Sequence, residues 1–164
     1  MNAKAIIYTS NTGYTARYAA MLSEKLGIPA HTLTDAQKVL PSGTPVIYMG
    51  WLMAGSVKDC KKAAKRFAIR AVIGVGLGDT GAQDAAARKA CALPTDVPVF
   101  TVQGGMDISK LQGPYRFVIR LLTKAMSAKK NATPDEARMA ELLQSGGDFV
   151  SEKELAAVLA WAEN

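Results

Sequence analysis

Three hydroxyl side chains surround one glycine near the N-terminus, where an apolar run of β-type residues ends. Ser10, Thr12 and Thr15 flank Gly13, and a helical pattern follows at once over 15–26. Phosphate binds exposed backbone N–H groups, hydroxyl donors and the positive end of a helix dipole. The segment therefore predicts a strand that enters a helix through a phosphate-binding turn. An ordinary turn capped by Ser or Thr is the alternative.

The turn lacks the signatures of nucleotide-binding loops. It contains no Lys and does not match Gly, four residues, Gly, Lys and then Ser or Thr. It is also not the three-glycine dinucleotide fingerprint. A triphosphate would need a cation and a metal here, whereas hydroxyls and dipoles alone can hold a singly esterified phosphate. The composition of the turn points toward FMN.

The same residues carry a resemblance to a known family. Ser10-Asn11-Thr12-Gly13-Tyr14-Thr15 resembles the flavodoxin phosphate loop, which reads Ser/Thr-x-Thr-Gly-x-Thr. The resemblance implies that the hydroxyls of Ser10, Thr12 and Thr15 and the amides of Asn11 to Thr15 hold the FMN phosphate. Its place directly after the first apolar run favours a ligand over a plain turn.

The elements that position this turn alternate along the chain. Strands are predicted at 3–8, 30–33, 46–50, 71–75 and 97–102. Helices are predicted at 15–26, 57–67, 82–92, 114–130, 134–143 and 151–161. This alternation predicts an α/β fold with a doubly wound, five-stranded parallel sheet and helices on both faces. The flavodoxin-like order 2-1-3-4-5 is implied by the resemblance, because the alternation alone does not give it.

The segment after the third strand is unusually apolar for a loop, and in such a sheet ligands lie beyond the carboxyl ends of the strands. Trp51 is the candidate for stacking on a flavin ring, with Leu52 and Met53 as softer walls. The resemblance implies that Met53, Ala54 and Gly55 supply the backbone that responds to the flavin redox state. Packing of Trp51 and Met53 into the core or a dimer contact is the alternative.

The segment after the fourth strand is rich in glycine. Gly76-Leu77-Gly78-Asp79 resembles the Gly-Leu-Gly-Asp run that flavodoxins have at this place. The resemblance implies that the amides of Leu77 to Asp79 bond the pyrimidine part of the ring. A glycine-rich turn that caps the next helix through Asp79 or Thr80 is a compatible alternative.

The segment after the fifth strand is longer than in simple flavodoxins. Its Gly-Gly-x-Asp-x-x-Lys-Leu run is similar to a flavodoxin-domain branch that includes bacterial menaquinone-dependent protoporphyrinogen dehydrogenases. The resemblance covers essentially the whole chain and leaves the substrate open. The extra basic helical segment spans about 106–147, and in its first helix Phe117, Leu121, Leu122 and Met126 are expected to face inward.

Length and charge limit the possible functions. The 164 residues predict one domain, 1–164, and the net charge is +6, whereas small flavodoxins are characteristically acidic. Basic residues cluster at 58–70 and 110–130. Such clusters attract acidic proteins, anionic membrane surfaces or carboxylated substrates such as porphyrins, although a solvated helix face is their commonest explanation. Nucleic acid is not favoured, because the few aromatic residues are not interleaved with the basic ones.

Metal and nucleophilic chemistry find little support. Cys60 and Cys91 have no ligand spacing, which favours free thiols, and His31 is the single histidine. The sequence has no run of eighteen apolar residues and no signal-type segment, so we expect a cytoplasmic protein.

The sequence therefore predicts an FMN-binding, flavodoxin-like redox protein. We expect it to pass electrons to a partner protein or a small-molecule acceptor, or to act on a quinone or porphyrin-type substrate. A non-enzymatic electron carrier, or a protein-binding module without flavin, is the alternative. No side chain is assigned a catalytic role, because the flavin itself carries out electron transfer.

Overall fold

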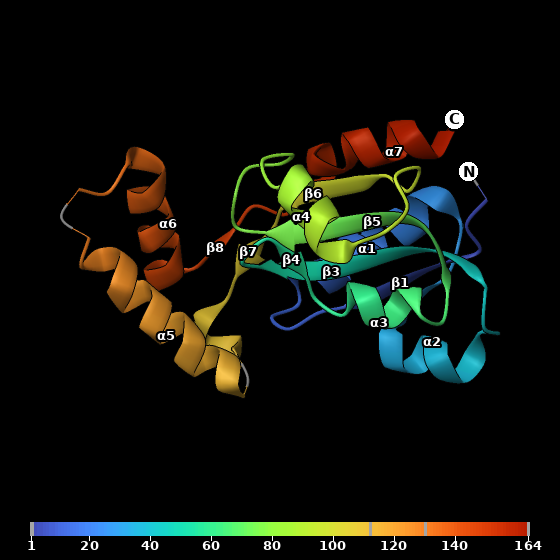
Figure 1. The fold of residues 1–164 in the computed structure, drawn as a ribbon, viewed down its shortest axis with the longest axis horizontal. Coiled ribbons are helices and arrows are strands. Elements are labelled where there is room, and N and C mark those ends of the chain that lie inside the picture. The colour runs from blue at the N-terminus through green and yellow to red at the C-terminus, as the bar shows by residue number, and fades with distance from the viewer. Residues whose placement is uncertain (1, 112, 130, 164) are drawn as a thin grey trace.

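A mainly parallel sheet forms the centre of the molecule (Figure 1). The computed structural model describes residues 2–111, 113–129 and 131–163. Neighbouring parallel strands follow the order β2-β1-β3-β5-β6, and β4 pairs with β3 in the antiparallel direction. These strands are β1 (Ala5–Thr9), β2 (Ala30–Thr32), β3 (Pro45–Met53), β4 (Ser56–Val57), β5 (Ala68–Gly76) and β6 (Val99–Gln103). The predicted α/β class with a mainly parallel sheet is confirmed.

Helices cover both faces of the sheet, and each face has its own apolar core. On one face Ile7 packs with residues of α2, α3 and α4, while on the other Ile6 packs with residues of α1, η2 and α7. Adjacent strand residues point to opposite faces, so strands covered on both sides are apolar almost throughout. The helices are α1 (Tyr14–Leu26), α2 (Leu33–Val39), α3 (Cys60–Ala64), α4 (Asp84–Cys91), η2 (Glu152–Leu155) and α7 (Ala156–Glu163).

The predicted apolar loop after the third strand is instead a tight hairpin. β3 continues to Met53, and β4 returns beside it through the turn Ala54-Gly55. Both turn residues have positive φ, 49° and 73°, as a type I′ hairpin turn requires. The prediction ended the strand at Gly50 because it assigned Trp51 and the residues after it to a loop. The hairpin also shortens the predicted helix 57–67 to α3.

The extra segment folds into a helical hairpin beyond one end of the sheet (Figure 1). Its helices are α5 (Pro114–Ser127) and α6 (Pro134–Ser145). β7 (Gly105–Met106) and β8 (Gly147–Asp148) form a two-stranded antiparallel ladder at its base, and η1 (Ile108–Lys110) follows β7. The predicted helix 114–130 ends at Ser127, and positions 112 and 130 of the predicted segment lie outside the described residues.

The inward face expected for the first of these helices is partly wrong. Phe117 and Leu121 are exposed, at 71% and 60% of their surface, whereas Met126 packs against the apolar cluster at the base of the hairpin. Leu122 borders the cavity described below, together with Tyr115 and Ile119, which were not predicted. Because α5 has apolar residues on two sides, helical spacing did not distinguish the side that packs. Within the described residues, no helix has the length and apolar character needed to cross a bilayer.

Candidate functional site

A cavity of about 260 Å³ lies between the carboxyl ends of the central strands and the helical hairpin. The sheet side contributes the turn after β1, the β3–β4 hairpin and the end of β5, and the other side comes from α5 and α6. All but three of the predicted site residues line it: Ser10, Asn11, Thr12, Tyr14, Thr15, Trp51, Leu52, Met53, Ala54, Gly55, Gly76 and Leu77. Gly13, Gly78 and Asp79 do not. The fold thus brings together the segments that the sequence singled out.

The turn before α1 has unused hydrogen-bonding capacity. Gly13 precedes the helix with φ 99°, and no side chain caps the first turn. That turn also contains no acidic residue. Ser10 Oγ is buried and has no hydrogen-bond partner among the described residues. Because a buried hydroxyl without a partner is costly, this donor set fits a bound anionic group such as a phosphate.

The aromatic wall of the cavity involves a contact across two distant segments. The ring of Trp51 meets Tyr115 of α5 edge to face, with 5.0 Å between the ring centroids and 85° between the planes. Such a pair is a favourable geometry for two aromatic rings. Trp51 therefore lines the cavity with part of its surface and holds α5 against the sheet with another part.

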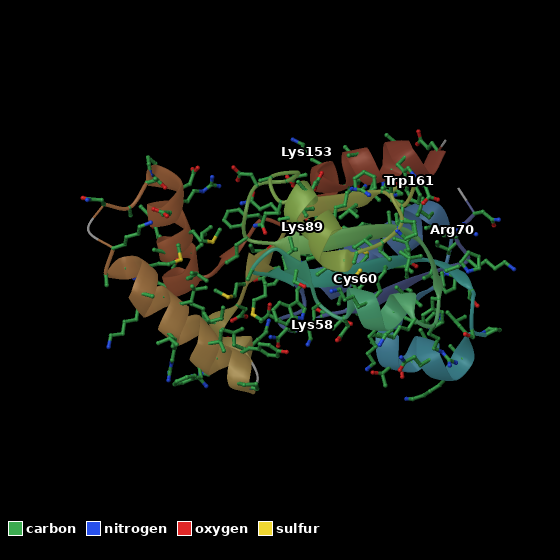
Figure 2. The ribbon with its side chains drawn as sticks, viewed as in Figure 1. Lys58, Cys60, Arg70, Lys89, Lys153 and Trp161 are labelled. Carbon is green, nitrogen blue, oxygen red and sulfur yellow. The ribbon has the colours of Figure 1, made fainter. Side chains whose placement is uncertain are left out.

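A cation also lies close to the ring of Tyr115. Lys58 Nζ is 5.8 Å from the Tyr115 ring centroid and 3.7 Å from Asp59 Oδ1, and Figure 2 labels this lysine. Hydrogen bonding to Tyr115 and the nearby Asp59 carboxylate raise the pKa of Lys58, so the side chain stays charged at neutral pH. These contacts anchor the N-terminal end of α5 beside the β3–β4 hairpin.

Glycines on β5 make room for the apolar floor. A Cβ at Gly74 would lie 2.9 Å from Leu52 Cγ, and a Cβ at Gly76 would lie 3.0 Å from Leu52 Cδ1. Both distances are shorter than a normal contact, so Leu52 occupies the space that side chains at these positions would fill. Leu52 can therefore lie across the end of β5 and form the floor of the cavity.

The loop after β5 is tied to neighbouring elements. Gln103 Nε2 donates to the Leu77 carbonyl at 3.1 Å, and Gln103 N donates to Thr80 Oγ1 at 2.9 Å. Asp79 forms an ion pair with Arg138 of α6, with 3.3 Å between Oδ1 and Nη1. Gly78 and Asp79 line a second, smaller cavity of about 170 Å³ together with residues of α6. In this structure Asp79 connects the sheet to the helical hairpin.

Sequence reasoning missed the contribution of the helical hairpin. The cavity residues not predicted are Val75, Gln83, Gly105, Met106, Leu111, Tyr115, Ile119, Leu122, Met139 and Leu143. The spacing of Tyr115, Ile119 and Leu122 places them on one side of a helix, so the stripe was visible in the sequence. The stripe does not indicate which part of the molecule it packs against, because that depends on how the helical hairpin is positioned relative to the sheet.

The two cysteines lie away from the cavity. Cys60 of α3 and Cys91 of α4 are buried free thiols in the core on one face of the sheet, and Figure 2 labels Cys60. The hydrogen bond to Cys91, followed by burial, raises the pKa of the Cys60 thiol, which makes it a poor nucleophile. Within the described residues, no group of three or more His, Cys, Asp or Glu side chains could hold a metal ion.

The arrangement combines three features: a turn with unused hydrogen-bond donors at a helix start, a mainly apolar cavity, and a helical hairpin that closes one side. A molecule with one anionic end and one flat apolar end matches this layout. The comparison with known proteins adds no relative on which to base a function. No protein-family model, no curated protein and no solved structure matches the chain.

Proposed function

We propose that this chain is a flavodoxin-like protein that binds FMN non-covalently and transfers electrons. The single observation that carries the proposal is the buried Ser10 hydroxyl, which has no hydrogen-bond partner within the described part of the chain. It lies beside the start of α1, which no described side chain caps, in the lining of a mainly apolar cavity. The order of the parallel strands supports it, because counted among themselves they run 2-1-3-4-5, as in flavodoxin-type sheets. In such sheets ligands lie at the carboxyl ends of the strands.

The residues present fit FMN at both of its ends. Ser10, Thr12 and Thr15 and the backbone amides of the turn would hold the phosphate, because hydroxyls and a helix start suit a dianion without a lysine. Trp51 and Leu52 would bound the ring and exclude water from it. FMN supplies the electron-transfer chemistry when bound, while the protein binds, orients and shields it.

The lining narrows the class of electron acceptor. Leu111, Ile119 and Met139 of the extra segment add an apolar wall to the cavity that Trp51 also lines. Such a wall favours a flat, apolar small-molecule acceptor, such as a quinone or porphyrin-type molecule, over direct contact with a redox partner protein. A partner protein would need to approach past the helical hairpin.

A second candidate is a binding module without flavin. The observation that favours it is the edge-to-face contact of Trp51 with Tyr115, which gives Trp51 a structural partner within the chain. In that case the cavity would take an apolar ligand, and the Ser10 hydroxyl would have no phosphate to bond.

The test is an absorption spectrum of the purified protein after addition of FMN and removal of the excess. We expect a retained flavin band that is shifted from that of free FMN. Riboflavin, which lacks the phosphate, should be retained much less, because it cannot use the turn before α1. Loss of all flavin at micromolar protein and FMN would contradict the proposal and favour the binding module.

Replacing Trp51 by Ala should lower FMN affinity about tenfold and shift the reduction potential of the bound flavin. A contact between two aromatic rings contributes about 0.5 to 1.5 kcal/mol of binding free energy in addition to the burial of apolar surface, and this contribution is lost in the variant. Trp161→Ala is the matched control. Trp161, in α7, packs against Phe100 of β6 and does not line the cavity (Figure 2). Unchanged affinity and potential in Trp51→Ala would remove Trp51 from the flavin site.

A further inference from the structure

Helix α5 exposes a row of large apolar side chains. Phe117 and Leu121 are exposed at 71% and 60%, and Val118 at 41%, whereas Leu122, at 43%, borders the cavity. Their spacing places them next to one another along one side of the helix. None of the residues of α5 is buried. So much exposed apolar surface on one helix marks an interaction surface.

Unpaired cations border this row. Arg116, Arg120 and Lys124 recur every fourth residue beside Phe117 and Leu121, and all three are exposed. They form no ion pair with a described residue, whereas the nearby Lys110 and Lys129 pair with Asp107 and Glu136. The sequence has no acidic residue from 108 to 134. The outer surface of α5 is therefore both apolar and strongly positive.

The opposite side of α5 fixes how the helix is oriented. Tyr115 and Ile119 point into the cavity, and Thr123 Oγ1 donates to the Leu143 carbonyl of α6 at 3.3 Å. The side of α5 that packs against the rest of the molecule is therefore already occupied. The exposed row is a second apolar side of the same helix. In Figure 1, no helix or strand covers the side of α5 that faces away from α6 and the sheet.

We propose that the outer side of α5 binds the surface of a membrane that contains anionic lipids. The row Phe117, Val118 and Leu121 would enter the boundary between headgroups and acyl chains, while Arg116, Arg120 and Lys124 contact lipid phosphates. An amphipathic helix of this kind lies in the plane of the membrane and does not cross it. The proposal goes beyond FMN binding and does not depend on it.

A second copy of the chain is a poorer occupant for this surface. A two-fold symmetric contact would bring the same patch of both copies together. Arg116, Arg120 and Lys124 would then face their own counterparts with no acidic residue of α5 between them. An anionic lipid surface instead supplies the complementary charge and a medium for the apolar row.

The experiment is co-sedimentation of the full chain, prepared without flavin, with vesicles. One set contains phosphatidylcholine alone, and the other contains phosphatidylcholine mixed with phosphatidylglycerol. We expect the chain to sediment with the mixed vesicles and to remain in solution with phosphatidylcholine alone. Raised salt should weaken the binding, because it screens the charges. Absence of binding to the mixed vesicles would overturn the proposal.

Paired variants separate the two contributions. Arg120→Gln with Lys124→Gln should weaken binding roughly 30-fold, because each cation near an anionic surface contributes about a factor of five. Lys61→Gln with Lys62→Gln removes the same charge from exposed positions on α3 and should have a much smaller effect. Equal weakening by both pairs would mean that net charge, and not α5, binds the vesicles.

The apolar row has its own variant and control. Phe117→Ser with Leu121→Ser should weaken binding at least about tenfold, because it removes the inserted surface. Val39→Ser changes an exposed apolar residue of α2 and should leave binding unaltered. Circular dichroism checks that each variant is folded. The parent chain could instead form concentration-dependent dimers and fail to bind vesicles. If the Phe117→Ser/Leu121→Ser variant then abolished those dimers, this surface would be assigned to a second copy of the chain.

Discussion

Joint replacement of Ser10 by Ala and Thr12 by Val should lower the affinity for FMN by at least about a hundredfold. Each lost hydrogen bond to a charged group costs about 1.5 to 3 kcal/mol, so two cost about 3 to 6 kcal/mol. Ser10 Oγ is buried without a hydrogen-bond partner among the described residues, and Ser10 and Thr12 both line the cavity. Titration of the protein against FMN fluorescence measures the loss.

Two controls separate phosphate binding from general damage. Riboflavin affinity should be the same in the double variant and the parent, because riboflavin has no phosphate. Ser42→Ala with Thr44→Val makes the same chemical changes before β3, at the opposite end of the sheet, where both hydroxyls donate to backbone carbonyls. If the Ser10/Thr12 variant binds FMN as tightly as the parent, the turn before α1 does not hold the phosphate.

Replacing Gly105 by Ala should lower the free energy of unfolding by about 3 kcal/mol. A Cβ at this position would lie 2.3 Å from the Gly147 carbonyl oxygen and 2.6 Å from Cε1 of Tyr14. The first of these neighbours is backbone, and Gly105 and Gly147 belong to adjacent positions of the β7–β8 ladder. The ladder has to separate to admit the methyl group, which loosens the base of the helical hairpin.

Urea unfolding of Gly105→Ala and Gly78→Ala provides the comparison. A Cβ at Gly78 would meet only Gln83 Nε2, at 3.0 Å, and this flexible end can move away. We therefore expect a change within about 1 kcal/mol for Gly78→Ala. Similar midpoints for the two variants would contradict the steric explanation for Gly105.

The junction of strand, turn and helix at Ser10 to Thr15 was predictable because its evidence is contiguous in sequence. Ser10 to Thr15 carry hydroxyls and a glycine at the junction of two clear periodicities, and the structure places a strand and a helix on either side. The central strands were predictable for a similar reason. Strands covered on both faces form continuous apolar runs. β3 and β5 contain the predicted strands 46–50 and 71–75, whereas β1 and β6 overlap the predicted strands 3–8 and 97–102 but start two residues later.

The opposite wall of the cavity was not predictable, because its contacts join distant segments. Trp51 pairs with Tyr115 and Asp79 with Arg138, and neither pair has a local signal. The side of α5 that packs was ambiguous, because Phe117 and Ile119 are both apolar and lie on different sides of the helix. Two residues of β4 were also too few to produce a period that a sequence pattern could reveal.

The antiparallel pairing of Met106 with Gly147 means that the helical hairpin leaves and re-enters the body at adjacent points. It is therefore a modular insertion: a chain that omits 107–146 could be closed by a short turn without displacing a strand of the central sheet. Much of its apolar packing is internal, since Leu111, Met126 and Leu143 belong to one cluster. Evolution could exchange such an insertion as a unit and change the outer wall of the cavity while keeping the turn before α1.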